Sequence, residues 1–295
     1  MYGHCEDPDE IGRRSNPMEY SANCINFAPL KAIELMATFL FDEIIFGPVK
    51  SRRLGVSLGI NLLPTKRKIC NFNCIYCECG WTGNIDKAIS HLPGREEVHN
   101  ALESKLSEMK AKNQVPDVIT YAGNGEPTLH PAFAAIIDDS IILRDLFFPK
   151  ARIAVLSNST TIADPVIKAA LLRVDMNILK LDSAFDSTIK MHNQPRVDIN
   201  AAKLIENLCA FNGKVIIQTL FLRGTYKGKV IDNTTPAEID AWLKALERIK
   251  PSEVMIYTIS RDTPEGASLN KVPLSELKAI AARVDSLSIR TQVSG

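Results

Sequence analysis

The 295-residue sequence contains no hydrophobic run long enough to cross a membrane. A transmembrane helix needs about 20 consecutive apolar residues, whereas the apolar stretch Leu35–Phe46 is short and contains Asp42 and Glu43. The amino end is polar and acidic, so the basic and then apolar pattern of a secretory signal is also missing. We therefore expect a cytoplasmic protein without a membrane partner.

An excess of charge of either sign is absent as well. The 35 Lys and Arg residues are balanced by 34 Asp and Glu residues, and the formal net charge is +1. Global charge therefore gives no indication of a nucleic-acid partner. Cysteine is scarce too, because seven residues are too few for a disulfide framework in such a chain. Four of them, Cys70, Cys74, Cys77 and Cys79, fall within ten residues, which indicates a metal site in a reducing compartment.

The first 35 residues lack the periodic patterns that follow them. They mix polar residues with three prolines and two isolated cysteines. Met36 then precedes a β-like run, Ala37–Phe46. We expect residues 1–35 to be a disordered extension, Met36 to be the natural start, and residues 36–295 to form the folded domain.

From about Gly55 onward, short β-type runs alternate with amphipathic helical patterns, which is typical of a parallel sheet with crossover helices. The expected strands are Val56–Asn61, Val118–Tyr121, Ile153–Ser157, Ile178–Leu181, Val215–Phe221 and Val254–Ile259. Helix signals stand between them, for example the capping box Thr235-Pro236-Ala237-Glu238. Six βα units are two short of a closed eight-unit barrel. The pattern therefore predicts an α/β fold that is either an open, partial barrel or a doubly wound sheet.

The strongest chemical pattern is the C-x3-C-x2-C triplet formed by Cys70, Cys74 and Cys77, directly after the first of these strands. Thiolates are the usual ligands of iron–sulfur clusters. Three of them would leave one iron of a [4Fe-4S] cluster open for a small molecule. A zinc knuckle is the structural alternative, but it normally needs a second ligand pair downstream. Cys79 could also serve as a fourth ligand and close the site.

A second pattern, Gly123-Asn124-Gly125-Glu126-Pro127, stands at the carboxyl end of the second strand. Ligands in α/β folds bind at the carboxyl ends of strands. Glycines let the backbone approach a ligand closely, and Glu126 could accept a hydrogen bond from an ammonium group. The alternative is a simple glycine turn before a helix.

Together, the two motifs resemble those of the radical S-adenosylmethionine (SAM) superfamily, over a range from about Gly47 to the end of the chain. The resemblance implies a partial (βα)6 barrel, a parallel sheet with outer helices, and two cofactors, a [4Fe-4S] cluster and SAM. It implies that Cys70, Cys74 and Cys77 bind the cluster, and that the open iron binds the amino and carboxylate groups of SAM.

The resemblance further implies that Tyr76 lies near the adenine, and that Gly123, Gly125 and Glu126 bind the methionine amino group. Asn124 departs from the Gly-Gly-Glu pattern of the superfamily. The segments Phe46–Gly55 and Glu126–His130 resemble iron–sulfur oxidoreductases related to tRNA wybutosine synthases. The second set of three cysteines that wybutosine synthases carry upstream is missing, since only Cys5 and Cys24 precede the first strand.

Polar residues at the ends of the later strands are further candidates for the cofactor site, because a buried polar group needs a partner. They are Ser157, Asn158, Asp182, Gln218 and Tyr257. Equally, these side chains could satisfy loop backbone. Lys180 shares a strand face with Asp182, and could be a catalytic amine or, more commonly, an ion-pair partner.

A basic set, Arg52, Arg53, Lys66, Arg67 and Lys68, flanks the cysteine loop. It is either a solvated face or the docking surface of an acidic one-electron donor such as flavodoxin or ferredoxin. The predicted function is reductive cleavage of SAM to a 5′-deoxyadenosyl radical that abstracts hydrogen from a substrate, which could be a tRNA, a protein or a peptide. The alternative is a non-catalytic iron–sulfur protein in electron transfer or interaction.

Overall fold

The computed structural model describes residues 39–51, 53–83, 92–260 and 268–295, all within one compact unit, Met36–Gly295. The predicted extension, residues 1–35, lies outside the described residues. A ten-stranded sheet forms the centre of the unit, and eight of its strands follow one path, β1-β2-β3-β4-β5-β6-β8-β10. Their bounds are Ile45–Ser51, Gly55–Ile60, Val118–Tyr121, Arg152–Ser157, Met176–Lys180, Ile216–Tyr226, Glu253–Thr258 and Arg290–Ser294.

Along this path every neighbouring pair from β2 to β10 is parallel, and β1 pairs antiparallel with β2 at the edge. Two short strands, β7 (Lys229–Asp232) and β9 (Leu269–Lys271), pair with the extended carboxyl half of β6. No ladder joins β1 to β10 in the part of the chain that the structure describes. The prediction of an α/β fold with an open, mostly parallel sheet is therefore confirmed.

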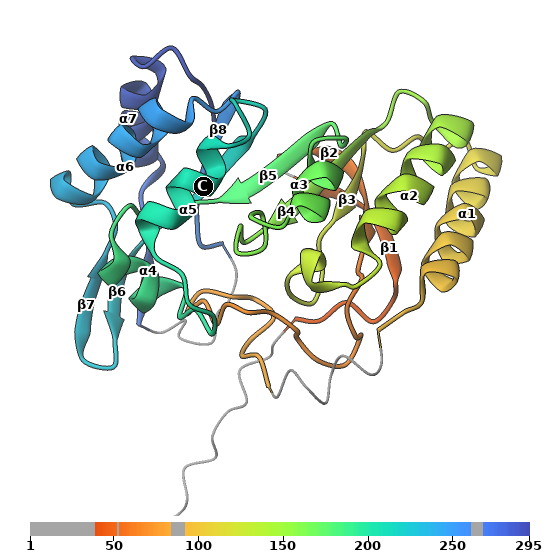
Figure 1. Ribbon diagram of the computed structural model, residues 1–295, viewed down its shortest axis with the longest axis horizontal. Helices are drawn as coiled ribbons and strands as arrows, with labels where there is room; N and C mark the ends of the chain where they lie inside the picture. The colour runs from red at the N-terminus through yellow and green to blue at the C-terminus, as the bar shows by residue number, and fades with distance from the viewer. Residues whose placement is uncertain (1–38, 52, 84–91, 261–267) are drawn as a thin grey trace, which may run out of the picture. The chain divides into compact units, whose positions relative to one another are not determined.

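Helices follow the parallel strands and give the six expected βα units (Figure 1). Their bounds are α1 Arg95–Ala111, α2 Phe133–Phe147, α3 Pro165–Leu171, α4 Asp186–His192, α5 Ala201–Cys209, α6 Pro236–Ile249 and α7 Leu274–Asp285. The two edge strands, β1 and β10, differ from the expectation. The β-like run before Phe46 only overlaps the start of β1, and β10 carries no strong strand pattern because its residues are only partly buried.

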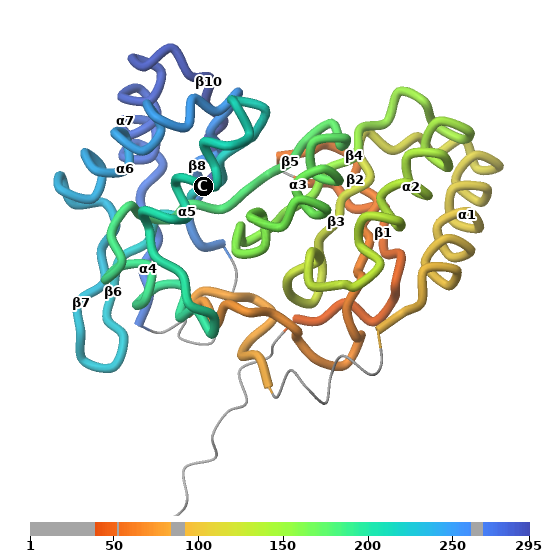
Figure 2. Tube along the Cα trace, viewed as in Figure 1, coloured from red at the N-terminus to blue at the C-terminus, as the bar shows by residue number. Residues whose placement is uncertain are grey.

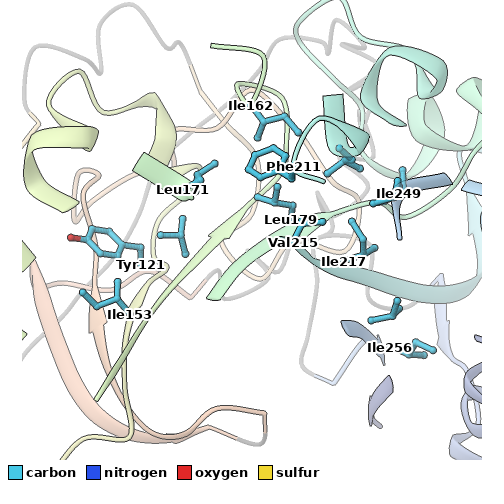
Figure 3. Close-up of a cluster of buried hydrophobic side chains, with 14 of the residues drawn as sticks. Tyr121, Ile153, Ile162, Leu171, Leu179, Phe211, Val215, Ile217, Ile249 and Ile256 are labelled. Atoms are coloured by element: carbon cyan, nitrogen blue, oxygen red, sulfur yellow. The ribbon is translucent and has the colours of Figure 1, made fainter. Parts of the chain in front are cut away.

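Alternate side chains of the strands serve the two faces of the sheet. On the outer face they join the helices in one large apolar cluster, part of which appears in Figure 3, with Leu179 of β5 and Ile217 of β6 beside Phe211 and Ile249 from the helical layer. On the inner face a smaller apolar set lies near the amino ends of the strands, for example Val118, Ala154 and Met255. Towards the carboxyl ends the inner face becomes polar, and this is where the candidate site lies.

Local sequence signals explain where α3 and α6 begin. Asp164 accepts hydrogen bonds from the amides of Val166 and Ile167 at 2.7 and 3.2 Å. Thr235 accepts one from the amide of Glu238 at 3.3 Å. The other half of the predicted capping box does not form, since the carboxylate of Glu238 accepts hydrogen bonds from the hydroxyls of Ser183 and Thr188 instead. Tertiary contacts thus engage the Glu238 carboxylate, which the local pattern assigned to the helix cap.

None of the described helices is both long and apolar enough to span a bilayer.

His192, at the end of α4, provides a test of the packing beneath the cysteine loop. Its side chain is buried, its Nδ1 has no hydrogen-bond partner among the described residues, and burial lowers its pKa to about 4. A histidine whose pKa is lower in the folded than in the unfolded chain stabilises the fold above pH 6.5. That contribution disappears as the pH falls towards 4, and the loss is about 2 kcal/mol at pH 5.

We predict that His192→Phe removes most of this acid sensitivity. The measurement is the free energy of unfolding in urea at pH 7 and pH 5. The matched control is His99→Phe, because the His99 side chain is 35% exposed and its replacement should leave the pH dependence of the wild type. Equal acid sensitivity of wild type and His192→Phe would contradict the prediction.

Candidate active site

A cavity of about 300 Å³ opens on the inner face of the sheet, at the carboxyl ends of its strands. This volume is at the lower end of the range of small-molecule sites. The lining residues come from the loop after β2, the turn after β3, the carboxyl ends of β4, β5 and β8, and the first half of β6, and Arg53 joins them from before β2. They are Arg53, Lys68, Cys70, Phe72, Cys74, Tyr76, Cys77, Glu78, Cys79, Gly123, Gly125, Glu126, Leu156, Ser157, Asn158, Lys180, Gln218, Leu220 and Tyr257.

The cysteine-bearing loop follows β2 and crosses towards α4 (Figure 2). Its backbone is bonded to the segment at the end of that helix, with the Asn73 amide 2.9 Å from the Asn193 carbonyl and the Ile75 amide 2.9 Å from the His192 carbonyl. Ile75 itself is fully buried. The loop is therefore held against the end of α4, although it contains no helix or long strand.

On its other side the cysteine loop pairs with the glycine turn. Ile69 and Gly125 form a parallel β-bridge, and the Glu126 amide donates to the Ile69 carbonyl at 3.0 Å. Gly125 has φ of 137°, and a Cβ at this position would lie 1.7 Å from the Ile69 carbonyl oxygen. Glycine is thus required here by the approach of the cysteine loop. The sequence interpretation, that glycine makes room for a ligand, missed this contact.

Asn124 is directed away from the cavity. Its side-chain amide donates to the carbonyls of Phe41 and Pro64 at 2.8 and 2.9 Å, and its side-chain oxygen accepts from the Phe41 amide at 2.8 Å. Gly123, Gly125 and Glu126 all line the cavity nevertheless. The departure from a Gly-Gly-Glu pattern therefore changes the support behind the turn and leaves its cavity side intact.

Lys68 is the positive charge closest to the thiols. It is only 4% exposed, and its ammonium donates to the Gly80 carbonyl at 2.9 Å. Burial opposes the charged form of Lys68, but the thiolates of Cys77, Cys70 and Cys74 raise its pKa. The sequence interpretation placed Lys68 in an exposed basic set, and that was wrong, because this lysine is buried among the cysteines.

The thiols differ in their surroundings. Burial raises the pKa of Cys70 to about 12 and also raises the pKa of Cys74. A hydrogen bond from Cys79 lowers the pKa of Cys77, whereas the same bond raises the pKa of Cys79. Cys77 is the thiol closest to the ionised state that binds metals. Cys79 lies beside it, 3.5 Å from the Gly123 carbonyl, and also lines the cavity.

Two side-chain amides approach the buried cysteines, and only one of them was predicted as a site residue. The Asn158 amide nitrogen lies 3.5 Å from Cys70 Sγ and 2.6 Å from Asn71 Oδ1. The Asn193 amide nitrogen lies 3.4 Å from Cys74 Sγ. Sequence reasoning missed Asn193 because it follows α4, far from any recognised motif. Donors to sulfur influence the potential of iron–sulfur clusters.

Glu126 is buried and holds the turn to its neighbours. One carboxylate oxygen accepts from the amide and hydroxyl of Thr128 at 3.1 and 2.5 Å, and the other accepts from the Asn158 amide at 2.6 Å. Burial raises its pKa, and these hydrogen bonds oppose the rise. The Ser157 side chain is a further hydrogen-bond partner of Glu126, so three residues of the chain fix this carboxylate.

Asp182 does not line the cavity, although it was a candidate. It is buried behind Tyr76, whose hydroxyl donates to it, and it also accepts from the Leu220 amide at 3.0 Å. The ammonium of Lys180 lies 3.4 Å from Asp182 and 3.2 Å from the Tyr257 hydroxyl. Asp182 therefore positions Tyr76 and Lys180, both of which face the cavity.

The remaining candidates are brought together as expected. Lining the cavity are Cys70, Cys74, Cys77, Tyr76, Gly123, Gly125, Glu126, Ser157, Asn158, Gln218 and Tyr257. Residues that the cofactor predictions did not include also line it, among them Arg53, Phe72, Leu156 and Leu220. The alternation of side chains along the strands could have indicated Leu156 and Leu220. The sequence placed Arg53 only in the basic set that flanks the cysteine loop, as part of a solvated face or a docking surface, and not inside the cavity.

The donor set fits an iron–sulfur cluster better than a single metal ion. Among the described residues, no three His, Cys, Asp or Glu side chains are close enough to hold one ion. Ligands of one zinc ion must all lie about 2.0–2.3 Å from it, so the described cysteines do not supply the compact set of a zinc knuckle. In a [4Fe-4S] cluster the thiolates bind different irons. Three cysteines along one cavity, with Lys68 between them, fit such a group.

The comparison with protein families decides what this arrangement is. Residues 67–232, more than half of the chain, match the model of the radical SAM superfamily. The chain belongs to this superfamily. Radical SAM proteins use a [4Fe-4S] cluster together with SAM, and the resemblance found in the two motifs is confirmed.

Curated relatives are 30–31% identical to this radical SAM chain over about three quarters of its length. A UPF0026 protein of Methanocaldococcus jannaschii is 31% identical over 75% of this chain and 65% of its own length. A UPF0026 protein of Helicobacter pylori is 30% identical over 74% of this chain and 67% of its own length. A protein named GTPase Obg from Brachyspira hyodysenteriae is 30% identical, but the match covers only 30% of it. The chain thus spans less than two thirds of the length of the Methanocaldococcus jannaschii and Brachyspira hyodysenteriae proteins.

Solved structures share the fold at low sequence identity. A radical SAM methyltransferase from Sphaerobacter thermophilus has a TM-score of 0.58 at 13% identity, over 81% of this chain and 65% of that one. Streptococcus suis SuiB has a TM-score of 0.55 at 14% identity, over 80% of this chain and 49% of that one. These similarities support the fold of the radical SAM chain and carry no information on its substrate.

We predict that Gly125→Ala displaces the cysteine loop, because the added methyl group would collide with the Ile69 carbonyl. After anaerobic reconstitution the variant should hold less than half of the wild-type iron. Its free energy of unfolding should be about 2 kcal/mol lower than that of the wild type. The matched control is Gly83→Ala in the same loop, where a Cβ meets no atom within 4 Å. Wild-type iron content in Gly125→Ala would show that the bridge between Ile69 and Gly125 is not needed.

Proposed function

We propose that this chain is a radical SAM enzyme, with residues 36–295 as its catalytic domain. Cys70, Cys74 and Cys77 hold the [4Fe-4S] cluster, and SAM occupies the cavity beside them. When bound, the cluster and SAM together supply one-electron cleavage of SAM to a 5′-deoxyadenosyl radical that abstracts hydrogen from the substrate. The observation that carries the proposal is the placement of all three cysteines and the Gly123–Glu126 turn on one cavity.

The residues of the chain bind and orient the cofactors. Glu126 accepts a hydrogen bond from the ammonium group of SAM, since it lines the cavity and is held rigidly by Thr128 and Asn158. Gly123 and Gly125 present backbone to the same group. Tyr76 is fixed by Asp182 and Asn193 and packs against the adenine.

The polar ends of the later strands complete the SAM site in this proposal. Ser157 and Asn158 lie next to Glu126, and Gln218 and Tyr257 line the opposite wall. Asp182 acts through Tyr76 and Lys180 and does not touch SAM. The apolar lining residues Phe72 and Leu220 exclude water from the reacting atoms.

A non-catalytic electron-transfer protein is the alternative function. Such a protein needs its cluster close to the surface and needs no small-molecule cavity beside it. The cavity favours the enzyme. Its polar and charged lining suits a substrate that presents heteroatoms, such as a tRNA, a protein or a peptide, and SuiB, which shares the fold, has been solved with a precursor peptide.

The first test concerns the ligands. Anaerobic reconstitution should give about four irons per chain, and replacing Cys70, Cys74 or Cys77 by Ala should remove most of them and abolish 5′-deoxyadenosine formation with dithionite and SAM. The matched controls are Cys79→Ala, beside Cys77, and Cys209→Ala on α5, both of which should keep the iron. Loss of the cluster in Cys79→Ala would mean a fourth ligand and a closed cluster, which would favour the electron-transfer alternative.

The second test concerns the electron donor. Of the basic set near the loop, Lys66 and Arg67 are exposed, whereas Lys68 is buried and Arg53 lines the cavity. Arg52 lies outside the described residues. Among the described members of the set, Lys66 and Arg67 are therefore the residues that could steer an acidic donor such as flavodoxin or ferredoxin.

Reversing both charges, Lys66→Glu with Arg67→Glu, should slow flavodoxin-driven SAM cleavage several-fold at low salt and much less at physiological salt, because exposed charges are screened. Cleavage driven by dithionite should stay unchanged. The control is Lys214→Glu with Lys278→Glu, two exposed lysines on other elements. Equal loss with both reductants would mean that Lys66 and Arg67 support the loop instead.

A further inference from the structure

Arg53 reaches the cavity from the end of the sheet opposite to the cysteines. It directly precedes β2, whereas the cysteine loop follows β2, and a strand of six residues is about 20 Å long. The backbone carbonyl of Arg53 is anchored by the side chain of Gln292 on β10 at 3.0 Å. Arg53 nevertheless lines the same cavity as Cys70, Cys74 and Cys77.

The guanidinium of Arg53 has a hydrogen-bond donor that no described residue satisfies, and that donor is available to a ligand. Its central carbon lies 4.5 Å from the centre of the Tyr257 ring, so the group stacks on that ring. Its Nη1 is buried and has no hydrogen-bond partner among the described residues. An unpaired buried donor on a charged group is costly. A guanidinium presents its donors in a fixed planar fork that matches carboxylate and phosphate oxygens.

Lys180 brings a second positive charge to the same place. Its ammonium lies 3.2 Å from the Tyr257 hydroxyl and 5.7 Å from the centre of the ring on which Arg53 stacks. Asp182, 3.4 Å away, balances the charge of Lys180 only. Arg53 therefore adds a positive charge at Tyr257 that this pair does not neutralise.

The acidic residues of the cavity lie elsewhere. Glu126 is engaged by Thr128 and Asn158 beside the cysteines. Glu78 belongs to the cysteine loop, and Lys68 is bonded to the same loop at Gly80. The cavity thus has two regions, the cysteine loop with the glycine turn and a basic region formed by Arg53, Lys180 and Tyr257. They meet at Lys180, because its ammonium also lies 5.2 Å from the centre of the Tyr76 ring.

We propose that this basic region binds an oxyanion, a carboxylate or a phosphate group, of the substrate. The inference rests on the proposed function, in which SAM lies beside the cysteines and reaches only the edge of Tyr257, so that the ring face on which Arg53 stacks is left for the molecule that reacts. Arg53 and Lys180 hold the anion, and Tyr257 orients both cations. The substrate is then one whose anionic group enters the cavity from the reacting end and reaches the wall formed by β8.

The experiment uses the reconstituted chain with SAM bound, and two probes, inorganic phosphate and succinate. Each probe is titrated at constant ionic strength against sodium chloride, and the rise in Tm gives an apparent Kd. We expect both probes to raise the Tm of the wild type, and the one that binds more tightly identifies the oxyanion. In Arg53→Gln the apparent Kd should increase at least tenfold, as expected when a charged hydrogen bond is lost.

Arg152→Gln is the matched control, since Arg152 stands at the amino end of β4, is exposed and does not line the cavity. It should bind both probes as the wild type does. Arg53→Lys keeps the charge without the planar fork, and should weaken binding by a smaller factor. If Arg53→Gln does not fold, a wild-type Kd in Arg53→Lys for both probes overturns the proposal.

Two further outcomes overturn it. The first is that neither probe raises the Tm of the wild type. The second is that Arg53→Gln weakens SAM binding by the same factor as it weakens phosphate binding, which would assign the basic region to the carboxylate of SAM. Failure of the proposed function has a different readout. A reconstituted wild type that never forms 5′-deoxyadenosine refutes the enzyme, whatever the response to phosphate.

Discussion

The site depends on one backbone contact, the bridge between Ile69 in the cysteine loop and Gly125 in the turn after β3. The loop has no regular secondary structure of its own, and its position relative to the sheet is fixed where the Ile69 carbonyl receives the Glu126 amide. Only glycine permits this approach, because any Cβ would overlap the carbonyl oxygen. The same contact places the carboxylate of Glu126 and the three thiols on one cavity. The cysteine motif and the Gly123–Glu126 motif are thus physically one unit.

Charge is distributed unevenly within that cavity. Lys68 lies among the thiols, where its ammonium favours the thiolates that a cluster requires. The hydrogen bond from Cys79 likewise lowers the pKa of Cys77. Lys180 and Arg53 surround Tyr257 on the other side. A chain with a formal net charge of +1 therefore concentrates three cations around one small space. Net charge gave no indication of this, since it averages over a surface on which acids and bases alternate.

The sequence predicted the parallel strands well because their signal is local and strong. Val118–Tyr121 was predicted with the bounds that β3 has, and β4 differs by one residue. The edge strands β1 and β10 were not predicted, since they are only partly buried and need no continuous apolar run. The prediction that Thr235 caps α6 is confirmed, but the role of Glu238 was wrong, because Ser183 and Thr188 from another βα unit compete for its carboxylate.

By itself the sequence determined the chemistry of the site: three closely spaced thiols, a glycine turn ending in Glu126, and a series of βα units that brings both to the same edge of a sheet. Those features depend on residues near one another in the chain. Tertiary structure alone decided which distant residues join them. Asn193 reaches Cys74, Lys68 turns inward, Asp182 withdraws behind Tyr76, and Arg53 enters from the far end of β2. The contacts of Asn193, Asp182 and Arg53 depend on the packing of elements more than 100 residues apart, and that of Lys68 depends on how the cysteine loop folds back to Gly80. No local pattern encodes either.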